Sequence, residues 1–294
     1  MFIFLLLSIL SSAALLIVLK SFVKWRVETM HGIIFNYWTA ASLALIFGPD
    51  HDLDIAAEVT AVLPATTVIG FLFITVFFIT AKTTQQLGLG IASVASKMSM
   101  VIPITAGIMM YHESLGPMKL LGLALAIPAV VITSYPERSN QDQEPFNLKL
   151  LLLPLLLFLG AGIVDTAIKY SQHRFMNDQN QHIIISAIFA SAGVFGIMRL
   201  LFELFILKKK LIFRSVAGGI LLGTVNYFSL YFLLECLASP GAESSTVFAY
   251  VNIGVVITSF ITGLFLFGEK VSRNKIIGIV LAVAAIVILA GYQN

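Results

Sequence analysis

The amino-acid sequence predicts an all-α integral membrane protein with ten transmembrane helices arranged as two inverted five-helix repeats. The prediction rests on the composition, on long apolar segments that recur along the chain, and on a polar linker near the midpoint. Of 294 residues, 59% are hydrophobic and only 11% are charged, whereas about 25% of an ordinary soluble domain is charged. The bilayer is therefore the expected solvent.

Nearly charge-free segments of roughly 17 to 25 residues recur along the chain, and each is long enough to cross ~30 Å of hydrocarbon as a helix. A β-barrel would need alternating apolar and polar residues, which segments 150–159 and 276–289 lack. The first span has no basic region before it and no cleavage site after it, so we expect a retained helix rather than a signal peptide. The predicted spans are about 2–21, 31–48, 61–81, 90–111, 117–135, 149–170, 182–206, 212–235, 244–268 and 274–291.

A polar, proline-containing linker over residues 136–148 divides the chain into a first repeat, 1–135, and a second repeat, 149–294. Segments His112–Gly122 and Gly268–Gly278 align at a constant offset and match Glu, Lys and Gly at equal spacing. Because each half contains an odd number of spans, the second half enters the membrane from the opposite side. Such inverted repeats are typical of secondary transporters, whose substrate site lies near the membrane midplane.

The ends of the two halves carry related short motifs, Tyr111–Glu113 before Leu120–Gly122 and Phe267–Glu269 before Ile276–Gly278. With these motifs and its ten spans, the whole chain resembles the drug/metabolite transporter superfamily, specifically its EamA-type members. The resemblance implies a basket of helices in which the first, third, fourth, sixth, eighth and ninth spans line a central cavity worked by alternating access. His112 departs from the family pattern, which has glycine at that place.

Lys97 is the leading candidate for a substrate-binding residue. It lies about 10 Å inside the fourth span, where a lysine costs roughly 2.5 to 3.5 kcal/mol. Ser93, Ser96 and Met100 surround it with small or polarisable side chains, so a substrate carboxylate or phosphate would fit beside the ammonium group. Alternatively, Lys97 neutralises an acidic side chain on a neighbouring helix.

Asp165 in the sixth span is the predicted proton or substrate-amine partner. Lys169 follows it by four residues, so the two could instead form a local structural ion pair. Between Lys97 and Asp165, a direct salt bridge and a bridging substrate or water are both open. Pro103 is a candidate gate hinge, with a static kink as the alternative. The predicted hydrogen-bonding residues for the solute, which could instead join helix to helix, are Asn226, Tyr227, Tyr250 and Asn252.

Other polar and small residues are predicted to have structural roles. Glu113 and Glu269 end their spans and are expected to cap loops or neutralise lysines, and Arg199 and Glu203 form an i,i+4 pair. Small residues allow close approach of helices, and the glycines expected to do so are Gly160, Gly162, Gly218, Gly219 and Gly223.

No catalytic residue, metal site or cofactor is expected. The chain has no phosphate-binding loop, nucleophile elbow or zinc-protease motif, and Cys236 is its single cysteine. Asp50–Asp54 lacks the pattern of a calcium loop and is interpreted as a solvated acidic loop. The net charge of +3 does not indicate nucleic-acid binding, because the positive charges lie in short loops between spans.

Lysine and arginine are unevenly distributed over the two sides of the membrane. Thirteen lie on the side of the odd-to-even connections: Lys20, Lys24, Arg26, Lys82, Arg138, Lys149, Lys208, Lys209, Lys210, Arg214, Lys270, Arg273 and Lys275. The other side carries three: Lys119, Lys169 and Arg174. The positive-inside rule places the first side in the cytoplasm and both termini outside, whereas the family resemblance implies cytoplasmic termini.

Together these patterns predict a secondary transporter, not an enzyme, that moves a small organic metabolite or drug-like solute with an anionic or zwitterionic group. We expect it in a bacterial cytoplasmic (inner) membrane, as a monomer or weak homodimer, with the proton as one candidate coupling ion. The alternatives are a non-transporting membrane enzyme that uses His112 and Glu113, and a lipid-linked carrier subunit.

Overall fold

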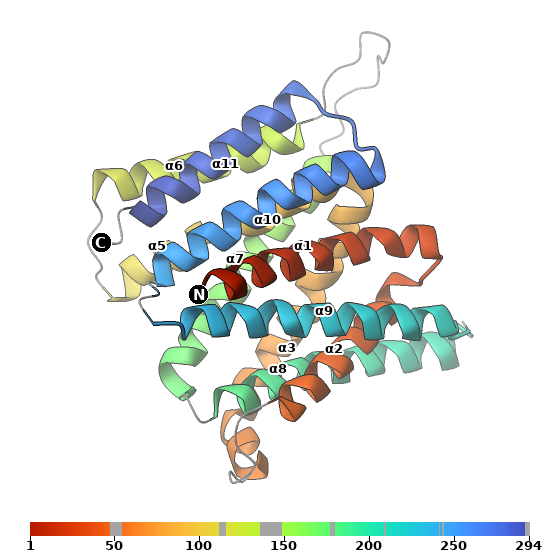
Figure 1. Cartoon of the computed structure of the whole chain (residues 1–294). Coiled ribbons are helices and arrows are strands. Elements are labelled where there is room, and N and C mark those ends of the chain that lie inside the picture. Colours follow the sequence, from red (N-terminus) through yellow and green to blue (C-terminus); the bar gives the residue numbers. More distant parts are fainter. Residues whose placement is uncertain are drawn as a thin grey trace. The chain divides into compact units, whose positions relative to one another are not determined.

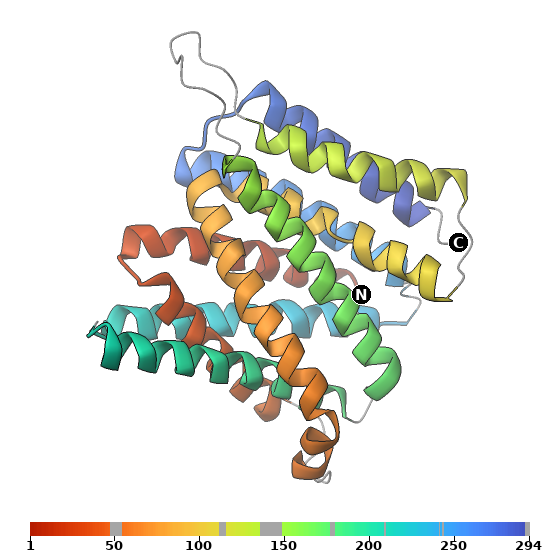
Figure 2. The same ribbon diagram turned by 180° about the vertical axis from the view of Figure 1, so that it is seen from behind.

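The computed structural model describes residues 1–47, 55–111, 116–135, 149–176, 180–208, 210–240, 242 and 244–291. These residues form helices joined by short turns, and no strand occurs among them. Figures 1 and 2 show the helices from opposite sides. The all-α prediction is therefore confirmed for the described chain, whereas linker 136–148 lies outside it.

Each of the ten predicted spans corresponds to a helix. Two are composite, since the fourth is divided into α4 and α5 and the seventh continues from α8 into a π-helical turn, η1. The elements are α1 (Phe2–Trp25), α2 (Thr29–Ile46), α3 (Ile55–Leu87), α4 (Leu89–Met98), α5 (Val101–Tyr111), α6 (Pro117–Ser134), α7 (Lys149–Phe175), α8 (Gln181–Leu201), η1 (Phe202–Ile206), α9 (Phe213–Leu237), α10 (Ser244–Phe267) and α11 (Arg273–Gly291).

Among the described residues, seven helices are long and apolar enough to cross a membrane: α1, α3, α4 with the start of α5, α7, α8 with η1, α9 and α10. These helices agree with an integral membrane protein. Membrane crossing by α2, α6 and α11 stays a prediction.

The chain forms two compact units, and each takes segments from both halves of the sequence. Unit 1 comprises residues 1–20, 79–163 and 229–294, and unit 2 comprises residues 21–78 and 164–228. The unit boundaries fall within α1, α3, α7 and α9. The predicted halves, 1–135 and 149–294, divide the chain by sequence repeat and not by contacts. This division into two repeats stays a prediction.

In unit 1, α6 packs along α11, and the pair lies side by side in both Figure 1 and Figure 2. A Cβ added at Gly122 would lie 2.6 Å from Leu289 Cγ, and one added at Gly278 would overlap Thr133. The offset that aligns the two motifs relates Gly122 to Gly278 and Thr133 to Leu289. The two close approaches are therefore equivalent under the repeat.

In unit 2, α2 packs against α8 and lies close to two glycines of α9. Added Cβ atoms at Gly219 and Gly223 would lie 2.5 Å from the carbonyl oxygens of Gly32 and Asn36. The predicted close approach at these glycines is therefore confirmed, and added Cβ atoms at Gly218 and Gly162 would also meet neighbouring side chains. The predicted role of Gly160 is untested.

Candidate functional site

The predicted fourth span is interrupted directly after the turn that carries Lys97. Helix α4 ends at Met98, and α5 begins at Val101. Pro103 explains the position of this break, because its nitrogen cannot donate to the carbonyl of Ser99 and its ring would clash with that group. The Ser99 carbonyl instead accepts from Ile102 N at 2.9 Å. The structure therefore has a break in the helix before Pro103, and both the gate hinge and the static kink stay predictions.

Ser99 and Ser96 close the end of α4. Ser99 Oγ donates to the Ser96 carbonyl oxygen at 2.5 Å, which satisfies one of the carbonyls that a helix end leaves without an intrahelical partner. Lys97 lies in this last turn, where a cation is stabilised by the negative end of the helix dipole. Its side chain is half-buried, as are those of Ser96 and Met100.

Helix α10 packs against α4 in unit 1 and brings Asn252 to the break. The Nδ2 atom of Asn252 donates to Met100 Sδ at 3.7 Å. The structure therefore assembles Ser96, Lys97, Met100 and Asn252 around the break, and we call these four residues the break site. Ser93 is predicted to belong to the site, but it is buried and its Oγ donates to the Gly90 carbonyl oxygen of the same helix at 2.9 Å.

The other predicted substrate-binding residues lie elsewhere. Tyr250 is two residues from Asn252, so the two occupy different faces of α10, and its side chain is 55% exposed. Asp165 is exposed, and Asn226 is half-buried. Tyr227 is buried and stacks on Phe47, with ring centroids 5.8 Å apart.

Asp165, Asn226 and Tyr227 belong to unit 2, whereas the break site belongs to unit 1. Their predicted contribution to substrate binding remains a prediction. His112, Glu113 and Asp50–Asp54 lie outside the described residues.

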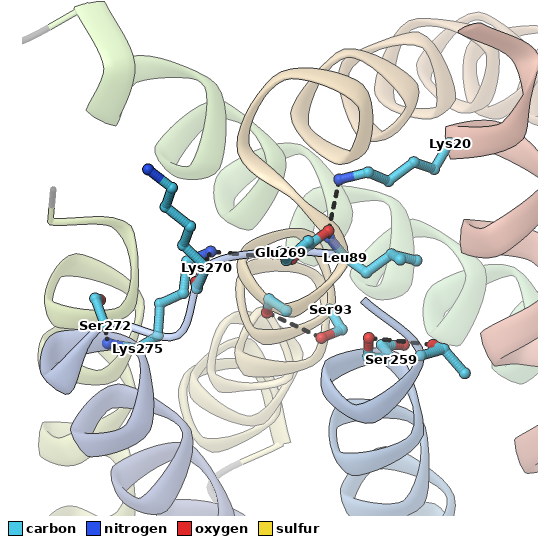
Figure 3. Close-up of polar contacts among 10 residues, drawn as sticks. Lys20, Leu89, Ser93, Ser259, Glu269, Lys270, Ser272 and Lys275 are labelled. Carbon is cyan, nitrogen blue, oxygen red and sulfur yellow. Dashed lines mark hydrogen bonds and ion pairs between the residues drawn. The ribbon is translucent and has the colours of Figure 1, made fainter. Parts of the chain in front are cut away.

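Glu269 fixes the other end of α4. Its Oε1 accepts from the Leu89 backbone N–H at 2.8 Å, so the carboxylate caps the start of α4, and the same oxygen lies 2.5 Å from Lys20 Nζ. Figure 3 shows Lys20 reaching Glu269 next to Leu89. The side chains of Lys20 and Glu269 are 17% and 12% exposed. The prediction that Glu269 neutralises a lysine is confirmed, and what the carboxylate caps is the start of helix α4 rather than a loop.

Two glycines with positive φ help to place this carboxylate. Gly88 precedes α4 with φ +108°, and a Cβ there would overlap the Glu269 carboxylate. Gly268 has φ +61° and reverses the chain after α10, which lets Glu269 N donate to the Gly263 carbonyl oxygen at 3.0 Å. The Gly268–Glu269 motif therefore serves to close α10 and to start α4.

The sequence reasoning missed Lys20 as the partner of Glu269, which lies 249 residues away in the chain. It also missed His31, which is buried beside the confirmed Arg199–Glu203 pair, with Nη2 of Arg199 2.8 Å from Oε1 of Glu203. The available signal for His31 was Glu28 three residues before it, an acidic residue in the position of a helix cap.

Known proteins match nearly the whole chain, in sequence in one case and in fold in another. No model of a known protein family matches the chain. A protein of Haemophilus influenzae, described as an uncharacterized protein, is 28% identical over 284 residues, which cover 95% of this chain and 94% of that protein. A crystal structure described only as that of a protein covers 98% of this chain and 99% of its own, with 12% identity and a TM-score of 0.54. This chain therefore resembles that solved protein in fold over nearly its whole length.

Proposed function

We propose that the protein is a secondary transporter that moves a small organic solute with an anionic or zwitterionic group across a bacterial cytoplasmic membrane by alternating access. The observation that carries the proposal is the interrupted helix α4–α5, with Lys97 in its last turn before the break. Backbone without helical hydrogen bonds is tolerated at membrane depth where it is buried in protein or lines a water-filled cavity. Interrupted helices form the substrate sites of many transporters.

The chemistry of the break site fits a charged solute. Lys97 would orient a carboxylate or phosphate group, and the amide of Asn252 offers both a donor and an acceptor. Ionisable residues within membrane-spanning helices mark substrate or ion pathways by default. The break site therefore combines one fixed charge with neutral polar groups.

Pairing of equivalent helices supports the proposed inverted repeats. The repeat offset relates α2 to α8, α4 to α10 and α6 to α11, and each of these pairs is in contact within its own unit. The reciprocal glycine contacts of α6 and α11 agree with a local two-fold relation. Ten spans in two inverted halves are also what the resemblance to EamA-type transporters implies, and we retain that family as part of the proposal.

Replacing Lys97 by alanine tests the proposal in proteoliposomes loaded with radiolabelled amino acids, dicarboxylates and amine drugs. We expect counterflow of a transported acid to fall by about tenfold to a hundredfold, because a hydrogen bond to a charged group contributes about 1.5 to 3 kcal/mol. Lys24→Ala is the matched control, since Lys24 also lies in the last turn of a helix but is exposed. No counterflow of any compound by the wild-type protein would contradict transport, and unchanged counterflow in Lys97→Ala would remove Lys97 from the site.

Replacing Pro103 by alanine tests the break itself. Alanine restores the N–H that can donate to the Ser99 carbonyl, so we expect a more continuous α4–α5 helix and counterflow slower by about tenfold. Pro64→Ala in α3 is the matched control, because it also removes a proline from inside a helix. Hydrogen exchange at residues 99–104 measures the restored helix, and unchanged exchange together with unchanged counterflow would contradict the prediction.

A further inference from the structure

Several basic side chains are exposed at one end of unit 2, and we call this group the basic end. Its members come from the end of α1, from the segment between η1 and α9, and from the first turn of α9: Lys24, Arg26, Lys208, Lys210 and Arg214. Among the described residues, none of these side chains has an ion-pair or hydrogen-bond partner. Water can solvate exposed cations, so their charge alone does not identify a binding site.

Contacts within unit 2 hold the segments of the basic end together. Glu28 N, in the turn after α1, donates to Ser215 Oγ in the first turn of α9 at 3.0 Å. His31 Nε2 in α2 lies 3.4 Å from Glu203 Oε2 in η1. In both Figure 1 and Figure 2 the ends of α1 and α8 and the start of α9 lie at the same end of the unit. The basic side chains therefore belong to one surface, although they are far apart in the sequence.

Two of these cations occupy backbone positions where glycine is usual. Arg26 has φ +54° and Lys208 has φ +51°, and they are the non-glycine residues with positive φ among those described. Arg26 follows α1, and Val27 N donates to the Phe22 carbonyl oxygen at 2.9 Å, the pattern of a helix end that favours glycine. The helix dipole favours a cation here, but Lys24 in the last turn of α1 already supplies one. The turn itself therefore does not explain the basic residue, whereas a use for its exposed charge does.

Exposed apolar side chains flank the cations. Residues 205–214 read Phe-Ile-Leu-Lys-Lys-Lys-Leu-Ile-Phe-Arg, and Phe213 and Phe205 are 81% and 73% exposed. Lysines and arginines beside exposed phenylalanine and leucine are typical of surfaces that lie at the boundary of headgroups and acyl chains. Basic clusters next to a membrane span attract anionic lipids. A soluble polyanion would meet the charges and leave the apolar side chains uncovered, whereas an anionic phospholipid matches both.

We infer that the basic end binds the headgroup of an anionic phospholipid, with the lipid phosphate among the cations and the acyl chains beside Phe205, Ile206 and Phe213. The positive-inside rule assigns this end to the cytoplasmic side. A lipid bound there joins the end of α1 to η1 and to the start of α9. The lipid site goes beyond the proposed transport function and does not rest on it.

The two tryptophans of the chain allow a direct test in lipid vesicles. Trp25 precedes Arg26, whereas Trp38 lies further along α2, and the two are similarly exposed, at 42% and 36%. In Trp38→Phe, fluorescence quenching of Trp25 is compared between vesicles in which phosphatidylglycerol carries brominated acyl chains and vesicles in which phosphatidylcholine carries them. We expect Trp25 to favour phosphatidylglycerol by about threefold or more at low salt, and the preference to fall toward one at about 1 M salt. In Trp25→Phe, Trp38 is the reporter and should show no preference.

Arg26→Gly combined with Lys208→Gly separates lipid binding from a structural role. Glycine suits the positive φ at both positions, so this double variant is expected to fold, while it removes two cations from the basic end. The preference for phosphatidylglycerol at Trp25 should fall by about half or more. Lys270→Gln combined with Arg273→Gln is the matched control, because it removes two exposed cations that belong to unit 1, and it should leave the preference at Trp25 unchanged.

Absence of any preference at Trp25 in the otherwise unchanged protein would overturn the inference. The same preference after Arg26→Gly with Lys208→Gly, or an equal fall in the control, would also overturn it. Loss of the preference on adding inorganic phosphate at constant ionic strength would identify a free anion, not a lipid, as the occupant. No transported solute is used, so a failed counterflow assay contradicts transport alone, and a missing lipid preference contradicts the lipid site alone.

Discussion

Glu269→Ala is expected to lower the stability of the protein by about 3 kcal/mol, the loss typical when one partner of a buried ion pair is removed. The carboxylate neutralises Lys20 and caps the Leu89 N–H at the start of α4. Its loss leaves a largely buried ammonium group without its nearest anion and leaves the start of α4 without its side-chain cap. In a thermal unfolding scan in detergent, the midpoint should fall by about 5 to 10 °C.

Two further variants separate the ion pair from the cap. Glu269→Gln keeps an oxygen that can accept from the Leu89 N–H but removes the charge, so it should cost less than Glu269→Ala. Lys20→Met removes the ammonium group and keeps an apolar side chain of similar length. If the ion pair dominates, Lys20→Met combined with Glu269→Gln will be more stable than Glu269→Gln alone.

Equal stability of wild type and Glu269→Ala would show that neither the ion pair with Lys20 nor the hydrogen bond from Leu89 N–H contributes to the stability of the protein. Lys275 bears on the size of the effect, since its Nζ lies 3.9 Å from Glu269 Oε2. Loss of Glu269 therefore leaves two cations near each other, and Lys275→Met in the Glu269→Ala background should recover part of the lost stability.

The sequence predicted the helices well, because a bilayer requires long apolar segments and hydropathy detects them directly. Helix ends were predicted less well where polar residues continue a helix. α3 extends to Leu87 rather than about residue 81, and α7 extends to Phe175 rather than about residue 170. Hydropathy reports the apolar part of a helix, whereas the backbone hydrogen bonds continue into its polar ends.

The break in the fourth span shows a second limit. Pro103 is visible in the sequence, but a proline disturbs the turn before it, so the helix is interrupted at Ser99 and Met100 rather than at the proline itself. Contacts between residues far apart in the sequence were not predicted. The pairing of Lys20 with Glu269 and of His31 with Glu203 depends on packing between helices that no local pattern records.

Gly278→Ala is the second substitution with a large expected effect, because it places a methyl group between α11 and the backbone of α6. The added Cβ would overlap Thr133 Oγ1 and lie 2.6 Å from Thr133 N and 2.8 Å from Thr133 Cα. Backbone atoms cannot turn aside as a side chain can, so the two helices must separate. We expect a loss of about 3 kcal/mol, the upper end for overpacking, measured as a lower midpoint of thermal unfolding.

Alanine substitutions at Gly122 in α6 and Gly90 in α4 test whether the steric clash causes the loss of stability, because the contacts of the added methyl group differ among the three positions. Gly122→Ala meets mainly Leu289 side-chain atoms, which can shift, and Gly90→Ala meets its nearest atom, Phe260 Cδ2, at an ordinary 3.5 Å. The loss of stability should therefore decrease from Gly278 to Gly122 and be near zero at Gly90. Thr133→Ala should recover only part of the loss in Gly278→Ala, since the backbone contacts remain. Full recovery would mean that the hydroxyl alone causes the clash, and equal losses at all three glycines would mean that the close packing of α6 on α11 does not set the cost.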